Sequence, residues 1–253
     1  MNKKIIKEQF NKQVQQFSNY DLTKNEIFLK FFYDFCKINR SLHLLDFACG
    51  TGEFAIFCSK SGNRVIGIDI AEKMIEFAKN ISSSTEQANI DFFCDDVENV
   101  NQPDNTFDVV TCRSAMHHMS SYKNVFKEMI RCSKPGGKIC IQDMISHENK
   151  HVDQYFEKFE QLVDISHNKT LSKQSMVELF LDNDIKVLDQ VEGQLEHDLY
   201  EYIGHAIQTE ENLHQIKNLI DEGMSDNIIS QYFLYKNEKL YFKRMGIIIY
   251  GEK

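Results

Sequence analysis

Between Leu42 and Asp143 the chain alternates five times between a short apolar run and a longer amphipathic segment. The apolar runs have the length of buried strands, and the segments between them carry apolar residues at helical spacing. Strands joined by helices form parallel sheets, because a parallel pair needs a long crossover connection. The alternation therefore predicts an α/β fold with a doubly wound, mostly parallel sheet, whose ligand lies at the carboxyl ends of the strands. The predicted strands are HLLDFA (43–48), RVIGIDI (64–70), NIDFFCDDV (89–97), FDVVTCRS (107–114) and KICIQDM (138–144).

The rest of the chain predicts helices before this region and a mixed region after it. Helical patterns cover 4–17, 25–37, 151–164 and 173–183, strand patterns cover 185–193 and 239–253, and a polar helical pattern covers 196–233. We expect a single domain over 1–253. Its parts are an N-terminal helical lid (1–40), a core that carries the ligand site (41–145) and a C-terminal half (146–253) with a helical insertion at about 196–233 before the last strand.

Composition narrows the class of protein and its partners. The 253 residues are 42% hydrophobic and 26% charged, and no stretch approaches the roughly 20 apolar residues that span a bilayer. The N-terminus has no apolar core of a secretory signal, so we expect a cytoplasmic protein without a membrane span. A net charge of −9 argues against a nucleic-acid partner, whose phosphates need basic surfaces. The seven cysteines include no C-x-x-C pair, which predicts reduced thiols and no metal site.

A glycine loop follows the first predicted strand. The stretch from Leu44 to Ala55 reads LLDFACGTGEFA, and GTGEFA satisfies the G-x-G-x-x-G/A pattern of dinucleotide sites. Such a loop lets the backbone approach a ligand at the N-terminus of the next helix. The pattern alone leaves open whether the ligand is a dinucleotide or another adenosine compound.

Acidic residues at the ends of three successive strands favour the second class. Asp46 precedes the loop, where a carboxylate would repel a pyrophosphate but suits the amino group and sulfonium of S-adenosylmethionine. Asp69 ends the second strand and can accept hydrogen bonds from ribose hydroxyls of either kind of cofactor. Asp96, or Asp95 beside it, can accept from the exocyclic amine of adenine. Together these residues predict a cationic, phosphate-free adenosine ligand.

Five motifs in order resemble the class I S-adenosylmethionine-dependent methyltransferases: LLDFACGTG, VIGIDIAEKMIEFA, CDDVENV, DNTFDVVTCRSAMHH and KPGGKICIQD. The likeness is closest to the branch around the ubiquinone/menaquinone-biosynthesis C-methyltransferases, the type 11 methyltransferase domain. It covers Leu44 to Asp143, and FNKQVQQFSNYDLT (10–23) is similar to the N-terminal helix and loop of that branch. The resemblance implies a Rossmann-like sheet of seven strands with an antiparallel last strand. It also implies S-adenosylmethionine as cofactor and S-adenosylhomocysteine as product.

The resemblance assigns the loop residues to the methionine and ribose parts of the cofactor. Asp46, Gly50 and Gly52 would surround the methionine part, and Asp69 would bind the ribose. Ala48 stands where the family often has glycine, and alanine is tolerated there if φ stays negative. The alternatives are that the glycines only form a turn and that Asp46 caps the following helix.

The resemblance assigns a second group of residues to the adenine and the floor of the site. Ile70 and Met74 would pack on the adenine, and Asp96 with the backbone of Val97 would contact its edge. Arg113 would begin the loop beneath the cofactor. Core packing of the following helix explains Met74 equally well.

Three residues are candidates for acid–base chemistry. His117 and His118 follow the fourth strand, where a methyl acceptor would approach, and a histidine has a pKa suited to removing a proton there. Asp143 ends the fifth strand and faces the same region. The alternatives are one packed and one solvent-facing histidine, and a capping role for Asp143.

Together these observations predict methyl transfer by in-line displacement to a small organic molecule. We expect Tyr20, with Phe17, to fold over the cofactor, although simple docking of the helix onto the sheet explains both residues as well. Apolar residues in the N-terminal helices and in 196–233 predict an acceptor with apolar surface. The alternative functions are methylation of RNA or protein, and binding of S-adenosylmethionine or S-adenosylhomocysteine without turnover.

Overall fold

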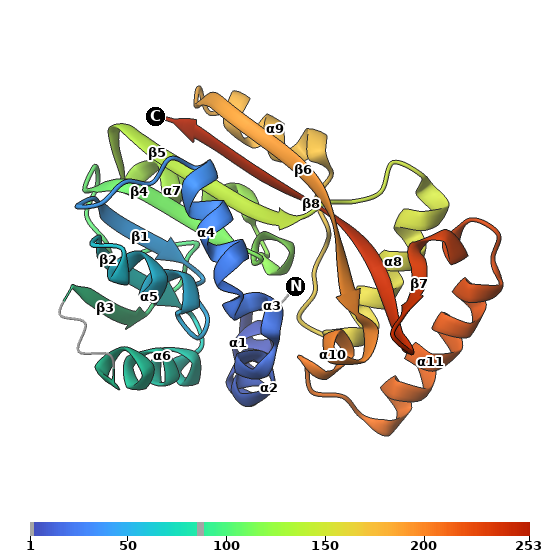
Figure 1. The fold of residues 1–253 in the computed structure, drawn as a ribbon. Coiled ribbons are helices and arrows are strands. Elements are labelled where there is room, and N and C mark those ends of the chain that lie inside the picture. Colours follow the sequence, from blue (N-terminus) through green and yellow to red (C-terminus); the bar gives the residue numbers. More distant parts are fainter. Residues whose placement is uncertain (1–2, 85–88) are drawn as a thin grey trace.

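A computed structural model describes residues 3–84 and 89–253, and within them eight strands form one sheet (Figure 1). Seven strands lie in the order β3-β2-β1-β4-β5-β8-β6, and β7 pairs with β8 off this path. The strands from β1 to β5 pair in parallel, whereas β8 is antiparallel to both β5 and β6. The strands are β1 (His43–Phe47), β2 (Arg64–Asp69), β3 (Ile90–Cys94), β4 (Phe107–Arg113), β5 (Ser133–Met144), β6 (Lys186–Asp198), β7 (Phe233–Lys236) and β8 (Lys239–Glu252).

The predicted doubly wound sheet with an antiparallel last strand is confirmed, and β7 is an addition that the sequence pattern did not predict. The helices are α1 (Lys3–Lys12), α2 (Val14–Asn19), α3 (Asp21–Lys24), α4 (Glu26–Phe35), α5 (Glu53–Lys60), α6 (Glu72–Ser84), α7 (Tyr122–Cys132), α8 (Lys150–Val163), α9 (Lys173–Leu181), α10 (Leu199–Gly204) and α11 (Glu210–Ser225). Two 3₁₀ turns, η1 (Met116–His118) and η2 (Ile229–Tyr232), complete them. None of the helices described is long and apolar enough to cross a membrane.

Helices cover both faces of the sheet, which is why its central strands are apolar on both sides. On one face α4, α5 and α6 bury a core that includes Phe32 and Phe54. On the other face α7 and α9 bury a core that includes Phe126 and Phe180. Both cores consist of closely packed, buried apolar side chains, so the sheet is a rigid platform for the residues at its strand ends.

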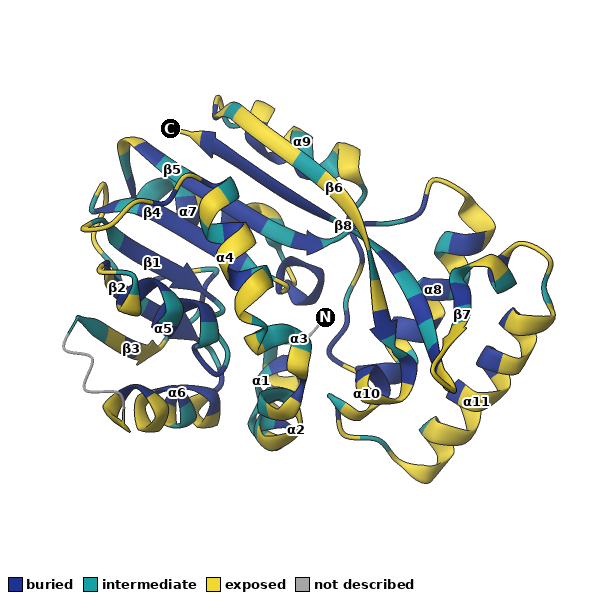
Figure 2. Cartoon of the chain, viewed as in Figure 1, coloured by how far each residue is buried: buried dark blue, intermediate teal, exposed yellow. Residues whose placement is uncertain are grey.

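The long strands β6 and β8 continue past the rest of the sheet into a second group of elements (Figure 1). There α8, α10, α11 and β7 pack around an aromatic core that includes Phe156, Phe159 and Phe242. In Figure 2 the outer side of α11 and much of the edge strands β6 and β3 are exposed, whereas the central strands β1, β2 and β4 are mostly buried. This group contains the predicted helical insertion at about 196–233.

The N-terminal helices lie between these two parts of the molecule (Figure 1). Helix α1 packs on α6, where Asn11 accepts a hydrogen bond from the N–H of Lys73 and donates to Glu72. Its Lys3 pairs with Asp96 just past the end of β3, and its Phe10 contacts His118 just past the end of β4, at the edge of the sheet where the candidate site is found.

Candidate functional site

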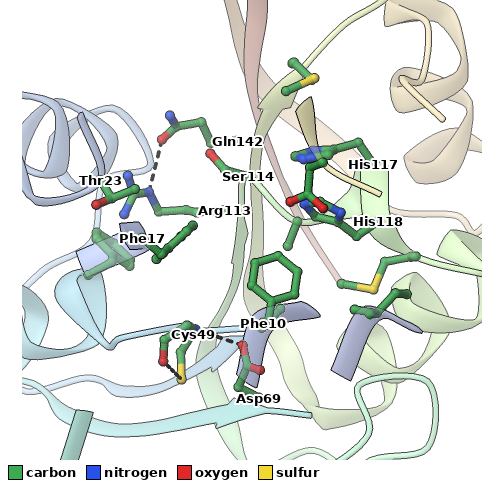
Figure 3. A pocket seen from close by; sticks show the side chains of 18 of the residues that line it. Phe10, Phe17, Thr23, Cys49, Asp69, Arg113, Ser114, His117, His118 and Gln142 are labelled. Atoms are coloured by element: carbon green, nitrogen blue, oxygen red, sulfur yellow. Dashed lines mark hydrogen bonds between the residues drawn. The ribbon is translucent and has the colours of Figure 1, made fainter. Parts of the chain in front are cut away.

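A cavity of about 210 Å³ lies at the carboxyl ends of β1, β2 and β4 (Figure 3). Most of the predicted site residues line it: Tyr20, Asp46, Ala48, Gly50, Asp69, Ile70, Asp96, Val97, Arg113, His117 and His118. Gly52, Met74 and Asp143 are not among its lining residues. The cavity is therefore where the sheet topology places a ligand, and acidic side chains outnumber lysine and arginine among its lining residues.

The glycine loop has three residues in the left-handed region. They are Ala48 (φ +51°), Gly50 (φ +55°) and Gly52 (φ +86°). The expectation that Ala48 keeps a negative φ is wrong, because the chain turns sharply directly after β1. A left-handed alanine costs about 1–2 kcal/mol, which the rest of the fold must offset.

The two glycines of the loop have different neighbours. A Cβ atom on Gly50 would lie 3.3 Å from the ring of Phe17, so this glycine allows α2 to approach the loop. A Cβ atom on Gly52 would lie 2.8 Å from Phe92 and 3.0 Å from Ala78. Gly52 therefore serves the packing of α5 against the sheet, and Gly50 is the glycine that faces the cavity.

Asp46 is a buried carboxylate at the bottom of the cavity, with 3% of its surface exposed. Its Oδ1 accepts a hydrogen bond of 2.6 Å from the hydroxyl of Thr111 on β4. Burial raises the pKa of Asp46 to about 6, although Thr111 and the charge of Arg113 oppose the shift. A cationic ligand beside this carboxylate would stabilise its charged form.

We expect the affinity for S-adenosylmethionine to depend on the charge of Asp46. Above its pKa the carboxylate is charged and attracts a cation, so affinity should fall about tenfold from pH 7 to pH 5. Calorimetric titration across this range measures the change. Thr111→Val removes a hydrogen bond that lowers the pKa of Asp46 and should move the midpoint to higher pH. An affinity that does not change with pH would exclude Asp46 from contact with the cation.

Asp69 ends β2 and holds the glycine loop. Its Oδ2 accepts from the N–H of Gly50 and its Oδ1 from the N–H of Ala71, both at 2.9 Å. Burial raises the pKa of Asp69, and these N–H groups offset part of the shift. Each carboxylate oxygen can still accept a further hydrogen bond, as a ribose hydroxyl would require.

Asp69→Ala should weaken binding of S-adenosylmethionine by about 1–3 kcal/mol, because a charged acceptor is lost. The dissociation constant from calorimetry measures this loss. Asp95→Ala is the matched control: Asp95 also accepts two backbone N–H groups, from Asp96 and Asn101, but it is not among the residues that line the cavity. If both variants bind S-adenosylmethionine as tightly as the wild type does, Asp69 does not contact the cofactor.

Just past the end of β3, Asp96 lies in the cavity wall and pairs with Lys3 of α1. Lys3 Nζ is 2.7 Å from Asp96 Oδ2 and 2.9 Å from Glu98 Oε2. Val97 lies between these acids and is buried. The sequence left Asp95 and Asp96 as alternatives for this position, and only Asp96 faces the cavity in the part of the chain that is described.

Other residues from β2, β4 and α5 complete the walls. Ile70 lines the cavity, whereas Met74 has no exposed surface and lies inside the core. Arg113 donates from Nε to Gln142 Oε1 at 3.2 Å, and its guanidinium lies 5.1 Å from the ring centre of Phe54. Burial lowers the pKa of Arg113, against the charges of Asp46 and Glu53.

Sequence reasoning missed several lining residues. Glu53 lines the cavity directly after Gly52, and an acid in the first turn after a glycine loop is a signal that could have identified it. Lys3 and Phe10 reach the cavity from α1, far from the motifs in sequence. No local pattern marks such residues, because only the tertiary fold brings α1 over β3.

His117 and His118 lie in the turn η1 after β4, on the side of the cavity away from Asp69 (Figure 3). His117 Nδ1 is 2.6 Å from Asp143 Oδ1 of β5. Burial lowers the pKa of His117, but the charge of Asp143 and this hydrogen bond outweigh it, so the pKa is raised overall. Asp143 therefore fixes the ring and favours a proton on Nδ1, which leaves Nε2 as the atom that can accept a proton.

His118 is neutral and contacts both Ser166 and helix α1. Its Nδ1 donates to the carbonyl oxygen of Ser166 at 3.0 Å, and burial lowers its pKa to about 3. The ring of Phe10 meets it edge-on, with centroids 5.0 Å apart. Gln13, between α1 and α2, donates to Asp164 Oδ2 at 3.3 Å, beside Ser166. In the described residues no group of three or more His, Cys, Asp or Glu side chains is placed to hold a metal ion.

The N-terminal segment also reaches the far side of the cavity through Tyr20. Its hydroxyl lies 2.8 Å from His197 Nδ1 of β6, and its ring stacks on His205 at 5.4 Å. Tyr20 is 9% exposed. The N-terminal segment thus contacts the glycine loop, the histidine pair and the C-terminal elements at once.

Comparison with known proteins agrees with this geometry. Residues 44–137 match the family described as "Methyltransferase domain". These residues form a class I methyltransferase domain. The predicted family is confirmed, and S-adenosylmethionine is the cofactor of such a domain. The glycine loop and the cavity-lining acids Asp46, Asp69 and Asp96 lie within the matched residues.

Three similar proteins carry methyltransferase names. "Uncharacterized methyltransferase YcgJ" of Bacillus subtilis is 28% identical over 146 residues, which are 58% of this chain and 58% of that protein. "Ubiquinone biosynthesis O-methyltransferase" of Coxiella burnetii is 34% identical over 97 residues, 38% of this chain and 41% of that protein. "Demethylmenaquinone methyltransferase" of Lactococcus lactis is 35% identical over 105 residues, 40% of this chain and 42% of that protein. The chain thus spans between 41% and 58% of the length of these relatives.

The fold likeness extends beyond the methyltransferase domain. The solved structure of YcgJ matches with a TM-score of 0.81 over 89% of this chain and 97% of that chain. The identity in this alignment is 24%, so it shows that the two chains share a fold. The fold shared with YcgJ therefore includes elements outside residues 44–137.

Proposed function

We propose that this chain transfers a methyl group from S-adenosylmethionine to a small organic molecule in the cytoplasm. The observation that carries the proposal is the cavity at the strand ends, where Asp46, Asp69 and Asp96 line one side and a histidine paired with a carboxylate lies on the other. The names of the quinone methyltransferases among its relatives support a small-molecule acceptor.

The chemistry of the cavity walls suits the proposed cofactor. Asp46 provides a negative charge for a cation, Asp69 an acceptor for hydroxyl groups, and Asp96 an acceptor for an amine. Gly50 leaves room that a Cβ atom would take. When bound, S-adenosylmethionine supplies an electrophilic methyl group on its sulfonium.

The protein's own contribution is alignment, exclusion of water and removal of a proton. We propose that residues 1–40 act as a lid, because Phe10, Phe17 and Tyr20 cover the cavity between the two parts of the molecule. Alignment and desolvation in such a site can contribute about 7–11 kcal/mol to the barrier reduction. No metal or covalent intermediate is required for these tasks.

We assign His117 as the general base and Asp143 as its positioning residue. Because its pKa is raised, the ring of His117 is a stronger base than the ring of His118, whose pKa is about 3. A base works best when its pKa lies near the working pH. His117 would then take the proton from a hydroxyl, carbon acid or amine of the acceptor as the methyl group is transferred.

Transfer of a radiolabelled methyl group into a metabolite extract tests the proposed function. Label in the small-molecule fraction would support it. The matched control for transfer is the His117→Gln variant, which keeps the three acids of the proposed cofactor site. Label in RNA or protein would instead establish a macromolecular methyltransferase. Binding of S-adenosylmethionine without labelled product would establish a binding protein and contradict the proposal.

A further inference from the structure

A second cavity of about 230 Å³ adjoins the first. Ser114, Gln142 and Met144, at the ends of β4 and β5, line both cavities. A molecule in the second cavity would therefore lie next to a ligand bound over the glycine loop. Asp143, the partner of the proposed base, also lines it.

The floor of the second cavity is formed by the face of β6 and β8 that looks toward α4. Gly193 of β6 pairs with Gly246 of β8, and Val191 pairs with Ile248 in the next row. A Cβ atom added to Gly193 would have no other atom within 4 Å. Gly193 thus leaves an open slot, whereas a Cβ atom on Gly246 would lie 3.3 Å from the carbonyl oxygen of Asp143. Phe31 of α4 also lines the cavity, with 51% of its surface exposed.

Arg244 lies at one end of this slot and is 3% exposed. Its Nη2 has only two weak contacts, at 3.3 Å to the sulfur of Met144 and 3.5 Å to the hydroxyl of Thr170. Its Nε is 3.1 Å from Glu160 Oε1, but the geometry is not that of a hydrogen bond, and both atoms are buried without one. A buried guanidinium with so few good acceptors is costly unless a ligand supplies them.

The other charges around the slot are already paired. Asp143 is engaged by His117, and Glu192 by Lys173. Glu160 accepts a hydrogen bond of 2.6 Å from the hydroxyl of Tyr202, on the side of Arg244 that faces the C-terminal core. Arg244 is paired with Glu160 through Nε and lies over the ring of Phe156, but its Nη2 has only weak acceptors. It is therefore the cation that a ligand in the slot would meet, and its planar fork fits a carboxylate.

We propose that the second cavity is the acceptor site and that it takes an apolar small molecule with a carboxylate group, which Arg244 binds. The apolar body lies over Gly193 and Gly246, and the reacting atom points past Met144 toward the first cavity. This inference rests on the proposed function, since it names the chemical class of the methyl acceptor.

Matched pairs of compounds test the proposal in the unchanged protein. A series of ω-phenylalkanoates of increasing chain length is titrated against the protein saturated with S-adenosylhomocysteine, and each acid is compared with its primary amide. We expect the best acids to bind about 10- to 100-fold more tightly than their amides, because the charged hydrogen bond to Arg244 is lost in the amide. If no acid binds, or if acids and amides bind equally, the proposal is wrong.

Two variants locate the binding. Gly193→Leu puts a side chain into the slot from a position where an added Cβ atom meets no other atom within 4 Å. It should keep the melting temperature and the affinity for S-adenosylhomocysteine but weaken acid binding at least tenfold. Gln194→Leu places the same side chain on the opposite face of β6 and should leave acid binding unchanged. Arg244→Gln should remove the preference for acids over amides. Acid binding that survives Gly193→Leu would overturn the proposed location.

This test separates the inference from the proposed function. Binding of S-adenosylhomocysteine and of acids, without methyl transfer to any acceptor, would contradict the function and leave the carboxylate site standing. Methyl transfer to acceptors that lack a carboxylate would support the proposed function and contradict the proposed carboxylate site.

Discussion

The His117→Gln variant should lose about 10²- to 10⁴-fold of kcat, because a positioned general base contributes a factor of this size. Its affinity for S-adenosylmethionine should stay close to that of the wild type, since His117 lies across the cavity from Asp46 and Asp69. Steady-state kinetics with the labelled cofactor and calorimetry measure the two quantities separately.

The pH dependence of kcat distinguishes His117 from His118. The base must be unprotonated, so kcat should rise with pH through the raised pKa of His117. Asp143→Asn removes the charge that raises this pKa and should shift the rise to lower pH while lowering kcat. His118→Gln should leave the position of the rise unchanged, because the pKa of His118 is about 3. A profile that moves with His118 and not with Asp143 would contradict the assignment.

Gly52→Ala should reduce the free energy of unfolding by about 2–5 kcal/mol, of which the left-handed backbone contributes 1–2 and the overpacking 1–3. Its φ is +86°, and the added methyl group would lie 2.8 Å from the buried ring of Phe92. Denaturant unfolding measures the loss. Binding of S-adenosylmethionine should also weaken, because Gly52 ends the loop that Gly50 begins.

Gly136→Ala is the matched control for the backbone contribution. Gly136 has a φ of +75°, and a Cβ atom there would have no atom within 4 Å. The control should lose only about 1–2 kcal/mol, the cost of a left-handed alanine alone. Equal losses in both variants would show that packing against Phe92 does not matter at Gly52.

The sequence could predict the parts of the fold that depend on local periodicity. The alternation of apolar runs and amphipathic segments places β1 to β5 and α5 to α7, because each element buries a face that its own residues define. Acids at the ends of strands could be assigned to one edge of the sheet, since parallel strands end together. This is why Asp46, Asp69 and Asp96 line a single cavity.

The parts that depend on tertiary contacts could not be predicted. Lys3 and Phe10 reach the site only because α1 docks on α6, and Arg244 faces the second cavity only because β8 pairs between β5 and β6. The positive φ of Ala48 also follows from the turn that the loop must make, which residue type does not reveal. The short β7 forms by pairing with the extended end of β8, and its own sequence is too short to mark it.

Calorimetric titration with S-adenosylmethionine and, separately, with a nicotinamide dinucleotide tests the central claim, that the acidic strand ends form a site for a cationic adenosine cofactor. We expect the protein to bind one equivalent of S-adenosylmethionine and to give no binding heat with the dinucleotide. Binding of the dinucleotide, with none of S-adenosylmethionine, would contradict the claim.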